Sequence, residues 1–305
     1  MADQPFYKSS IFLAIAACFL WSTAFVGIKI GLQYTTPLQF AGMRFMISGI
    51  IILPFCRNIK SNLILLKKNA FKVLRISLFQ TAILYTFFYQ GMDRTPAAIG
   101  AIVVGGGPLF VAFLAHFITG RDPLIPKKII ALLIGFSGIV LLALAKDSSI
   151  DNRLTLLTGI VMLVIGNFAG SFGNILVSQS KTGISPVFLN SIQIFTGGLI
   201  ILMVSFFIEG FHFAVKPTPY YLSLGYLSFM SAVAFSFWFV VLNRPEVKVS
   251  EINVWKFIIP VIGAILSWLL IAGEKPQWHT LSGMTLIAAA IIIIYGRFKK
   301  ESALV

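Results

Sequence analysis

TPAAIGAIVVGGGPLFVAFLAHFIT, residues 95–119, places Gly105-Gly106-Gly107-Pro108 in the middle of an apolar run that is long enough to cross a bilayer. In water, these residues would weaken a helix by about 1 kcal/mol for each glycine and about 3 kcal/mol for the proline. Inside a membrane, such a break is tolerated where neighbouring helices or a water-filled cavity satisfy the freed carbonyl groups. The break therefore marks either tight packing against another helix or the wall of a cavity.

The composition of the whole chain places this run in a membrane protein. Of its 305 residues, 58% are hydrophobic and 11% are charged, whereas a soluble domain carries roughly 25% charged residues. The net charge of +14 does not indicate nucleic-acid binding, because the basic residues gather at helix ends and in short connections. Cys18 and Cys56 both lie in apolar runs, so they predict no disulfide framework. No cofactor or metal site is predicted.

The apolar runs predict an all-α integral membrane protein with ten transmembrane helices. A run of about 20 residues spans the roughly 30 Å hydrocarbon layer as a helix, and such runs recur with short connections between them. The expected spans are 10–31, 37–56, 72–91, 96–118, 127–145, 154–177, 186–208, 219–242, 250–272 and 278–297.

The distribution of Lys and Arg predicts that both termini are cytoplasmic. The connections on the side of the N-terminus hold most of the basic residues, including a cluster between the second and third spans. Basic residues are enriched in cytoplasmic connections, so we expect a multi-pass protein of the cell membrane, inner or plasma. The cluster consists of Arg57, Lys60, Lys67, Lys68, Lys72 and Arg75, and the opposite side holds Arg94, Lys146, Arg153, Lys216 and Lys275.

The two halves of the chain resemble each other. Pro37–Leu53 aligns with Pro186–Leu202, and Gly120-Arg121-Asp122-Pro123 aligns with Gly273-Glu274-Lys275-Pro276. We therefore expect two five-helix repeats, residues 1–147 and 148–305. Because five is odd, the second repeat enters the membrane from the opposite side, and such inverted repeats are typical of transporters that bind substrate between the repeats. Chance similarity between apolar helices is the alternative.

Short motifs in this order resemble the EamA branch of the drug/metabolite transporter superfamily. They are Trp21-Ser22, Arg44-Phe45, Pro96-Ala97-Ala98, Pro108-Leu109-Phe110, Gly120 and Gly273-Glu274. The resemblance covers essentially all ten spans and implies a solute carrier, commonly an exporter of amino acids or related metabolites. Arg121 departs from it, because the Gly-Glu pair of the family would place an acid there.

Candidate substrate-binding residues follow from polar and aromatic side chains within the spans. Asn167, Ser171 and Asn174 recur along one face of the sixth span, and polar side chains facing lipid would be costly. They either bond neighbouring helices or line a cavity. The full set is Trp21, Gln80, Tyr85, Tyr89, Gly107, Asn167, Ser171, Asn174, Trp238, Asn253, Trp255 and Lys256, with hinge residues Gly105, Gly106, Pro108 and Pro260.

Charged residues are rare within the spans. Lys29 lies near a span end and can extend toward the membrane surface, and Arg44 suits a structural hydrogen bond. Lys256 either binds a substrate carboxylate or extends toward the cytoplasm. Every Asp and Glu lies near a span end or in a connection. A proton-coupled exporter of cationic drugs usually keeps a carboxylate at mid-depth, so a neutral or zwitterionic solute moving down its gradient fits better.

The function predicted from the sequence is a secondary transporter that exports amino acids or related solutes by alternating access, and not an enzyme. A nucleotide-sugar carrier or lipid-linked flippase is the alternative within transport, although its substrate phosphates would require several inward Arg or Lys side chains. An intramembrane enzyme would need paired acids, a metal-ligand cluster or an activated nucleophile. The expected partners are a small solute and membrane lipid, with the chain as monomer or homodimer.

Overall fold

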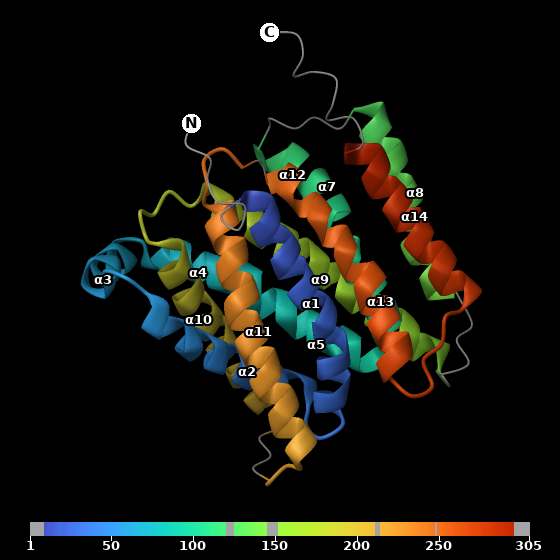
Figure 1. Ribbon diagram of the computed structural model, residues 1–305, viewed down its shortest axis with the longest axis horizontal. Helices are drawn as coiled ribbons and strands as arrows, with labels where there is room; N and C mark the ends of the chain where they lie inside the picture. Colours follow the sequence, from blue (N-terminus) through green and yellow to red (C-terminus); the bar gives the residue numbers. More distant parts are fainter. Residues whose placement is uncertain (1–8, 120–124, 145–151, 211–213, 248, 296–305) are drawn as a thin grey trace.

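The computed structural model describes residues 9–119, 125–144, 152–210, 214–247 and 249–295. Within these ranges the regular structure is helical throughout (Figure 1). The spanning helices of the first half are α1 (Ser10–Leu32), α2 (Pro37–Ile52), α4 (Ala70–Ser77) with α5 (Leu84–Arg94), α6 (Ala97–Gly105) with α7 (Gly107–Thr119), and α8 (Pro126–Leu144). Those of the second half are α9 (Arg153–Gln179), α10 (Pro186–Ile208), α11 (Thr218–Leu242), α12 (Val249–Asn253) with α13 (Ile258–Leu270), and α14 (Trp278–Tyr295).

These helices confirm an all-α membrane protein, and each of the ten expected spans coincides with one of them or with a consecutive pair. Seven segments in the described ranges qualify as membrane spans by length and composition, and Trp255–Leu270 and Trp278–Ile293 are shorter apolar helices. Proline fixes the start of two spans: Pro37 and Pro186 occupy the first turns of α2 and α10. Proline is favoured there because its missing N–H would have no partner in the helix.

Three spans contain irregular backbone. The third span joins α4 to α5 through a π-helical segment, Leu78–Ile83. The fourth span breaks at Gly106, between α6 and α7, and the ninth span joins α12 to α13 through a 3₁₀ segment, Val254–Phe257. Such interruptions leave backbone groups that other parts of the protein must satisfy.

The packing of the helices shows the inverted repeat. The most extensive helix contacts pair α2 with α10, α8 with α14, α6 with α13, α1 with α11, and α5 with α9. The first span of the chain corresponds to the sixth, the second to the seventh, and so on through the fifth and tenth. When corresponding spans are exchanged, the first three pairs stay the same. The same exchange converts the α1–α11 pair into the α9–α5 pair. The five interfaces therefore obey a two-fold relation between the halves.

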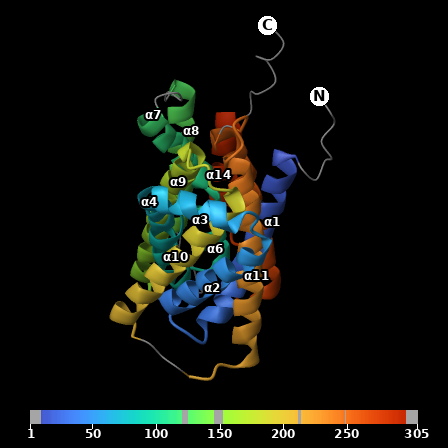
Figure 2. The same ribbon diagram turned by 90° about the vertical axis from the view of Figure 1, so that its left-hand side faces the viewer.

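One helix lies outside the predicted spans. The connection between the second and third spans contains α3 (Ile59–Lys68), which the pattern of long apolar runs does not predict, because this helix is short and rich in lysine. Figure 1 shows α3 at the left-hand edge of the bundle, beyond α4 and α10. In Figure 2, which views the bundle from that side, α3 lies in front of the spanning helices.

Candidate functional site

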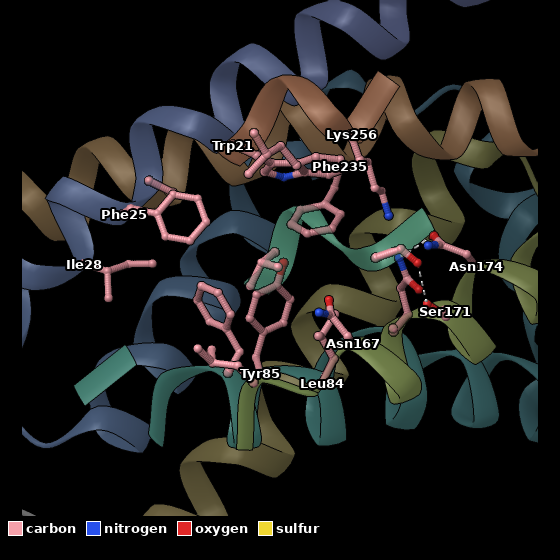
Figure 3. Close-up of a pocket in the computed structure, with 18 of the residues that line it drawn as sticks. Trp21, Phe25, Ile28, Leu84, Tyr85, Asn167, Ser171, Asn174, Phe235 and Lys256 are labelled. Carbon is pink, nitrogen blue, oxygen red and sulfur yellow. Dashed lines mark hydrogen bonds between the residues drawn. The ribbon is translucent and has the colours of Figure 1, made fainter. Parts of the chain in front are cut away.

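A cavity lies between the two halves, lined by residues from the middle parts of their spans. Its volume is about 100 Å³, which is room for several water molecules, since one buried water needs roughly 10–15 Å³ by a comparable measure. Trp21 of α1, Tyr85 of α5 and Asn167 of α9 surround it, and Lys256 of the 3₁₀ segment extends its amino group toward it (Figure 3).

The three glycines of the fourth span have different surroundings. A side chain at Gly105 would collide with the ring of Pro260, so Gly105 lets α6 pack directly against α13. Gly106 ends α6, and its carbonyl accepts a hydrogen bond from the Leu109 N–H at 2.9 Å. Gly107 lines the cavity, where a side chain would meet only Asn167 Oδ1, at 3.7 Å. Tight packing and a cavity wall therefore occur two residues apart.

The polar face of α9 forms hydrogen bonds to the backbone on both sides of this break. Asn167 Nδ2 donates to the carbonyl of Val103 at 2.7 Å, and Ser171 Oγ donates to the carbonyl of Gly107 at 3.4 Å. Asn167 and Ser171 also line the cavity. The two alternatives for this face, bonding between helices and cavity lining, thus apply together.

Further along α9, Asn174 joins three spans through its side-chain oxygen. Asn174 Oδ1 accepts hydrogen bonds from Gln80 Nε2 at 3.2 Å and from Trp238 Nε1 at 3.0 Å. Two buried groups at the cavity have no hydrogen-bond partner among the described residues, Gln80 Oε1 and Trp21 Nε1. Both side chains line the cavity, and Gln80 Oε1 itself packs closely against Gly173.

Arg44 is a cation at the cavity, and each of its three guanidinium nitrogens already donates a hydrogen bond. Its guanidinium donates to Ser231 Oγ at 2.7 and 3.0 Å and to the hydroxyl of Tyr89 at 2.6 Å. It also lies 4.9 Å from the centroid of the Phe45 ring. The structural hydrogen bond expected for Arg44 agrees with these contacts.

Lys256 differs from Arg44 because no carboxylate or hydrogen-bond acceptor contacts its amino group within the described part of the chain. Its Nζ lies 4.7 Å from the ring centroid of Trp238 and 5.8 Å from that of Trp21. Such cation–π contacts stabilise a buried ammonium group while leaving its N–H donors available. The side chain of Glu251, the acid nearest in sequence, lies outside the described residues.

Aromatic rings form one wall of the site. Trp21 packs against Phe235 with ring centroids 5.1 Å apart and against Trp238 at 5.3 Å. Tyr85 packs against Phe235 at 6.1 Å and Phe45 at 4.2 Å. Interlocked rings of this kind hold one another in place, so the cavity wall is fixed by packing.

The predicted site residues divide into two groups. Tyr89 and Trp238 lie behind the wall as partners of Arg44 and Asn174, Asn253 donates to the Val249 carbonyl, and Trp255 packs on the apolar core. The cavity is lined by the others: Trp21, Gln80, Tyr85, Gly107, Asn167, Ser171, Asn174 and Lys256.

The lining also contains residues that the sequence did not single out. Most are aliphatic or aromatic, and in the sequence nothing distinguishes them from ordinary core residues. Phe25 is the exception, because it lies four residues after Trp21 and so on the same face of α1. These residues include Ala24, Phe25, Ile28, Leu84, Val104, Leu163 and Ile259.

At one end of the bundle, two carboxylates of the second half cap helices of the first half. Glu274, between α13 and α14, accepts the N–H groups of Ala97 and Ala98 at 2.7 and 3.0 Å, at the start of α6. Glu209, after α10, accepts the N–H groups of Leu38 and Gln39 at 3.1 and 3.2 Å, at the start of α2. Arg121, which stands where the Gly-Glu pair of the family would place an acid, lies outside the described residues.

Comparison with known families and proteins agrees with this architecture. The model of the EamA-like transporter family matches residues 8–144 and 157–296. The uncharacterized transporter YvbV of Bacillus subtilis is 21% identical, over 99% of this chain and 96% of that protein. A probable amino-acid metabolite efflux pump of Salmonella typhimurium is 26% identical, over 94% of this chain and 93% of that protein.

A further relative and a solved structure extend the comparison. The uncharacterized inner membrane transporter YedA of Escherichia coli is 24% identical, over 94% of this chain and 92% of that protein. A crystal structure aligns with a TM-score of 0.68 and 16% identity, covering 94% of this chain and 96% of the other. At that identity, the likeness shows a shared fold.

Proposed function

The chain belongs to the EamA-like transporter family, and on that premise we propose that this membrane transporter exports small amino-acid-like solutes, neutral or zwitterionic, by alternating access at the cavity between the repeats. The name of the Salmonella relative, a probable amino-acid metabolite efflux pump, supports this solute class.

The observation that carries the proposal is the unpaired amino group of Lys256 beside the cavity. A buried cation without a counter-charge favours a ligand that brings one. A solute carboxylate would accept hydrogen bonds from Lys256 Nζ, with the unpaired N–H of Trp21 as a second donor. Charge-assisted bonds of this kind are about twice as strong as neutral ones.

The remaining groups suit the other end of a zwitterion. Gln80 lines the cavity, and its Oε1 would have to turn away from Gly173 to accept from an ammonium group. The rings of Trp21, Tyr85 and Phe235 line the same cavity. Aromatic faces attract cations and also accommodate apolar side chains. The cavity thus combines a donor site, an acceptor site and an apolar wall.

Alternating access requires that each end of the bundle can close. The caps made by Glu209 and Glu274 join the two repeats at the end opposite the N-terminus. Gly105, Gly106, Pro108 and Pro260 are the proposed hinge, where the fourth and ninth spans meet. We propose that both termini are cytoplasmic, so that the capped end faces outward.

A phosphate-bearing substrate, such as a nucleotide sugar, fits this site less well. Phosphates attract several Arg or Lys side chains, whereas Arg44 is engaged with Ser231 and Tyr89. Among the described lining residues, this leaves the single amino group of Lys256.

Counterflow in proteoliposomes tests the proposal. Vesicles preloaded with an unlabelled solute would be mixed with traces of the labelled one, across amino acids, sugars, nucleotide sugars and cationic dyes. We expect exchange with amino acids or closely similar zwitterions. Exchange confined to nucleotide sugars or dyes would refute the proposed solute class.

A further inference from the structure

We propose that α3 and its flanks, residues 55–75, form a binding site for the headgroups of anionic phospholipids at the end of the bundle where the N-terminus lies. This segment is called the α3 platform below. It lies outside the cavity and has no part in the solute site described above.

Bulky apolar side chains are exposed on the α3 platform. Phe55 is 75% exposed, Phe71 is 72% exposed and Ile64 is 58% exposed, with Ile59 and Leu63 also exposed. Ile59, Leu63 and Ile64 belong to α3, which projects sideways from the bundle (Figures 1 and 2), whereas Phe55 and Phe71 lie just before and after it. Amphipathic helices that lie in the membrane interface bury such side chains among lipid headgroups and upper acyl chains.

Every charge on the α3 platform is positive. Its sequence from Phe55 to Arg75 contains no Asp or Glu, so the basic side chains have no acidic neighbours within the segment. The six basic residues, all exposed, are Arg57, Lys60, Lys67, Lys68, Lys72 and Arg75. Clusters of this kind beside a membrane span are complementary to anionic lipid surfaces. The exposed apolar side chains between the lysines favour a lipid surface over a soluble acidic partner.

Hydrogen bonds hold the α3 platform in a fixed position. Asn62 is buried, donates to the carbonyls of Arg57 and Asn58 at 2.9 and 3.1 Å, and accepts from the Ser185 N–H at 2.9 Å. Asn69 Nδ2 donates to the Thr182 carbonyl at 3.4 Å. Both asparagines therefore attach α3 to the connection between α9 and α10 in the second repeat. Lipid bound here would restrain that connection.

Native mass spectrometry of the full chain with phosphatidylglycerol or phosphatidylcholine tests this inference. We expect the detergent-purified protein to retain phosphatidylglycerol preferentially, and Lys60→Gln/Lys67→Gln/Lys68→Gln to weaken this binding at least about tenfold. The matched control, Arg153→Gln/Lys216→Gln/Lys275→Gln, removes the same charge from the opposite end and should retain wild-type binding. Equal binding by the two triple variants would overturn the proposal.

A second measurement places the lipid without relying on the triple variant. A polarity-sensitive fluorophore attached through Ile64→Cys, in a Cys56→Ser background, would be compared in nanodiscs of the two lipids. We expect a blue-shifted emission in phosphatidylglycerol and a smaller shift in phosphatidylcholine. Water-like emission in both lipids would contradict the proposal that α3 contacts the membrane. Equal blue shifts in both lipids would contradict the proposal that α3 prefers anionic headgroups. Binding of an acidic soluble protein in place of lipid would also overturn the proposal.

Discussion

Gly105 and Gly107 are both glycines, but they have different functions at the break in the fourth span. Gly105 permits contact between α6 and the Pro260 ring, while Gly107 leaves open space at the cavity. The contact is reciprocal, because a side chain at Gly263 would meet the Ala101 side chain at 2.8 Å. The interrupted spans of the two repeats are therefore in direct contact.

This difference predicts opposite outcomes for two similar substitutions. Gly105→Ala should destabilise the protein by about 1–3 kcal/mol, because the new methyl group overlaps the Pro260 ring. Gly107→Ala should change stability much less and instead reduce transport by narrowing the cavity. Thermal unfolding in detergent, followed by counterflow with the two variants, measures both effects. Equal melting temperatures for the two variants would contradict this distinction.

At the same scale, the sequence predicts polar site residues better than apolar ones. Asn167, Ser171 and Asn174 could be predicted, because polar side chains repeated along one helix face need a partner inside a membrane. The partners themselves could not be predicted. Asn167, for example, donates to the Val103 carbonyl, which also accepts the Gly106 N–H beside the break. Asn253 and Trp255 were assigned to the site by their nearness to Lys256 in sequence, yet they are not among the lining residues.

At the scale of the element, helix starts in one repeat depend on acids in the other. α6 begins after Pro96, and its first N–H groups would lack acceptors without Glu274. Ser267 of α13 also donates to Glu274, which links the two interrupted spans through one carboxylate. The same arrangement joins Glu209 to the start of α2.

Glu274→Gln should weaken this closure. The amide keeps one acceptor oxygen but loses the negative charge that favours a helix N-terminus, and we expect a loss of about 1 kcal/mol in stability. Glu246→Gln, at an exposed acid of the opposite end, is the control and should behave as wild type. Equal unfolding temperatures for both variants would show that the Glu274 cap contributes nothing.

The elements themselves were largely predictable, with α3 as the main exception. Long apolar runs predict spans because nothing else buries so many hydrophobic residues in sequence. The short α3 mixes five apolar residues with lysines and lies below the length of a span, so hydropathy alone gave no signal. The π-helical segment of the third span was also unpredicted, because its residues, Leu78–Ile83, have no distinctive pattern.

At the scale of the whole molecule, the two-fold relation between the repeats explains why a weak sequence similarity was informative. Each half supplies one member of every major helix pair, so the two halves must match in the lengths and positions of their spans. The expected boundary between residues 147 and 148 lies outside the described residues and stays a prediction.

The orientation of the molecule is open to a direct test. In intact cells, a membrane-impermeant maleimide should label Lys216→Cys from outside and fail to label Lys67→Cys on α3, in a Cys56→Ser background. The reason is that the basic connections are expected to be cytoplasmic. Labelling of Lys67→Cys alone would reverse the proposed orientation and with it the assignment of the outer caps.

Energy coupling is a second property of the whole molecule. No Asp or Glu lies at mid-depth in any span, so we expect counterflow to be unaffected by a protonophore. A protonophore acts on the proton gradient alone, and a neutral dye-release assay would control for vesicle leakage. Loss of counterflow with intact vesicles would require a proton-binding group that this account does not include.

The measurement that tests the central claim most directly is solute binding by Lys256→Met. Removing the one uncommitted amino group at the described cavity should weaken binding of carboxylate-bearing solutes by about 1.5–3 kcal/mol, or roughly 10- to 100-fold. Amines of the same size that lack a carboxylate should be affected much less, and Lys127→Met, outside the cavity, should bind both as wild type does. An equal loss for carboxylates and amines would contradict the role proposed for Lys256.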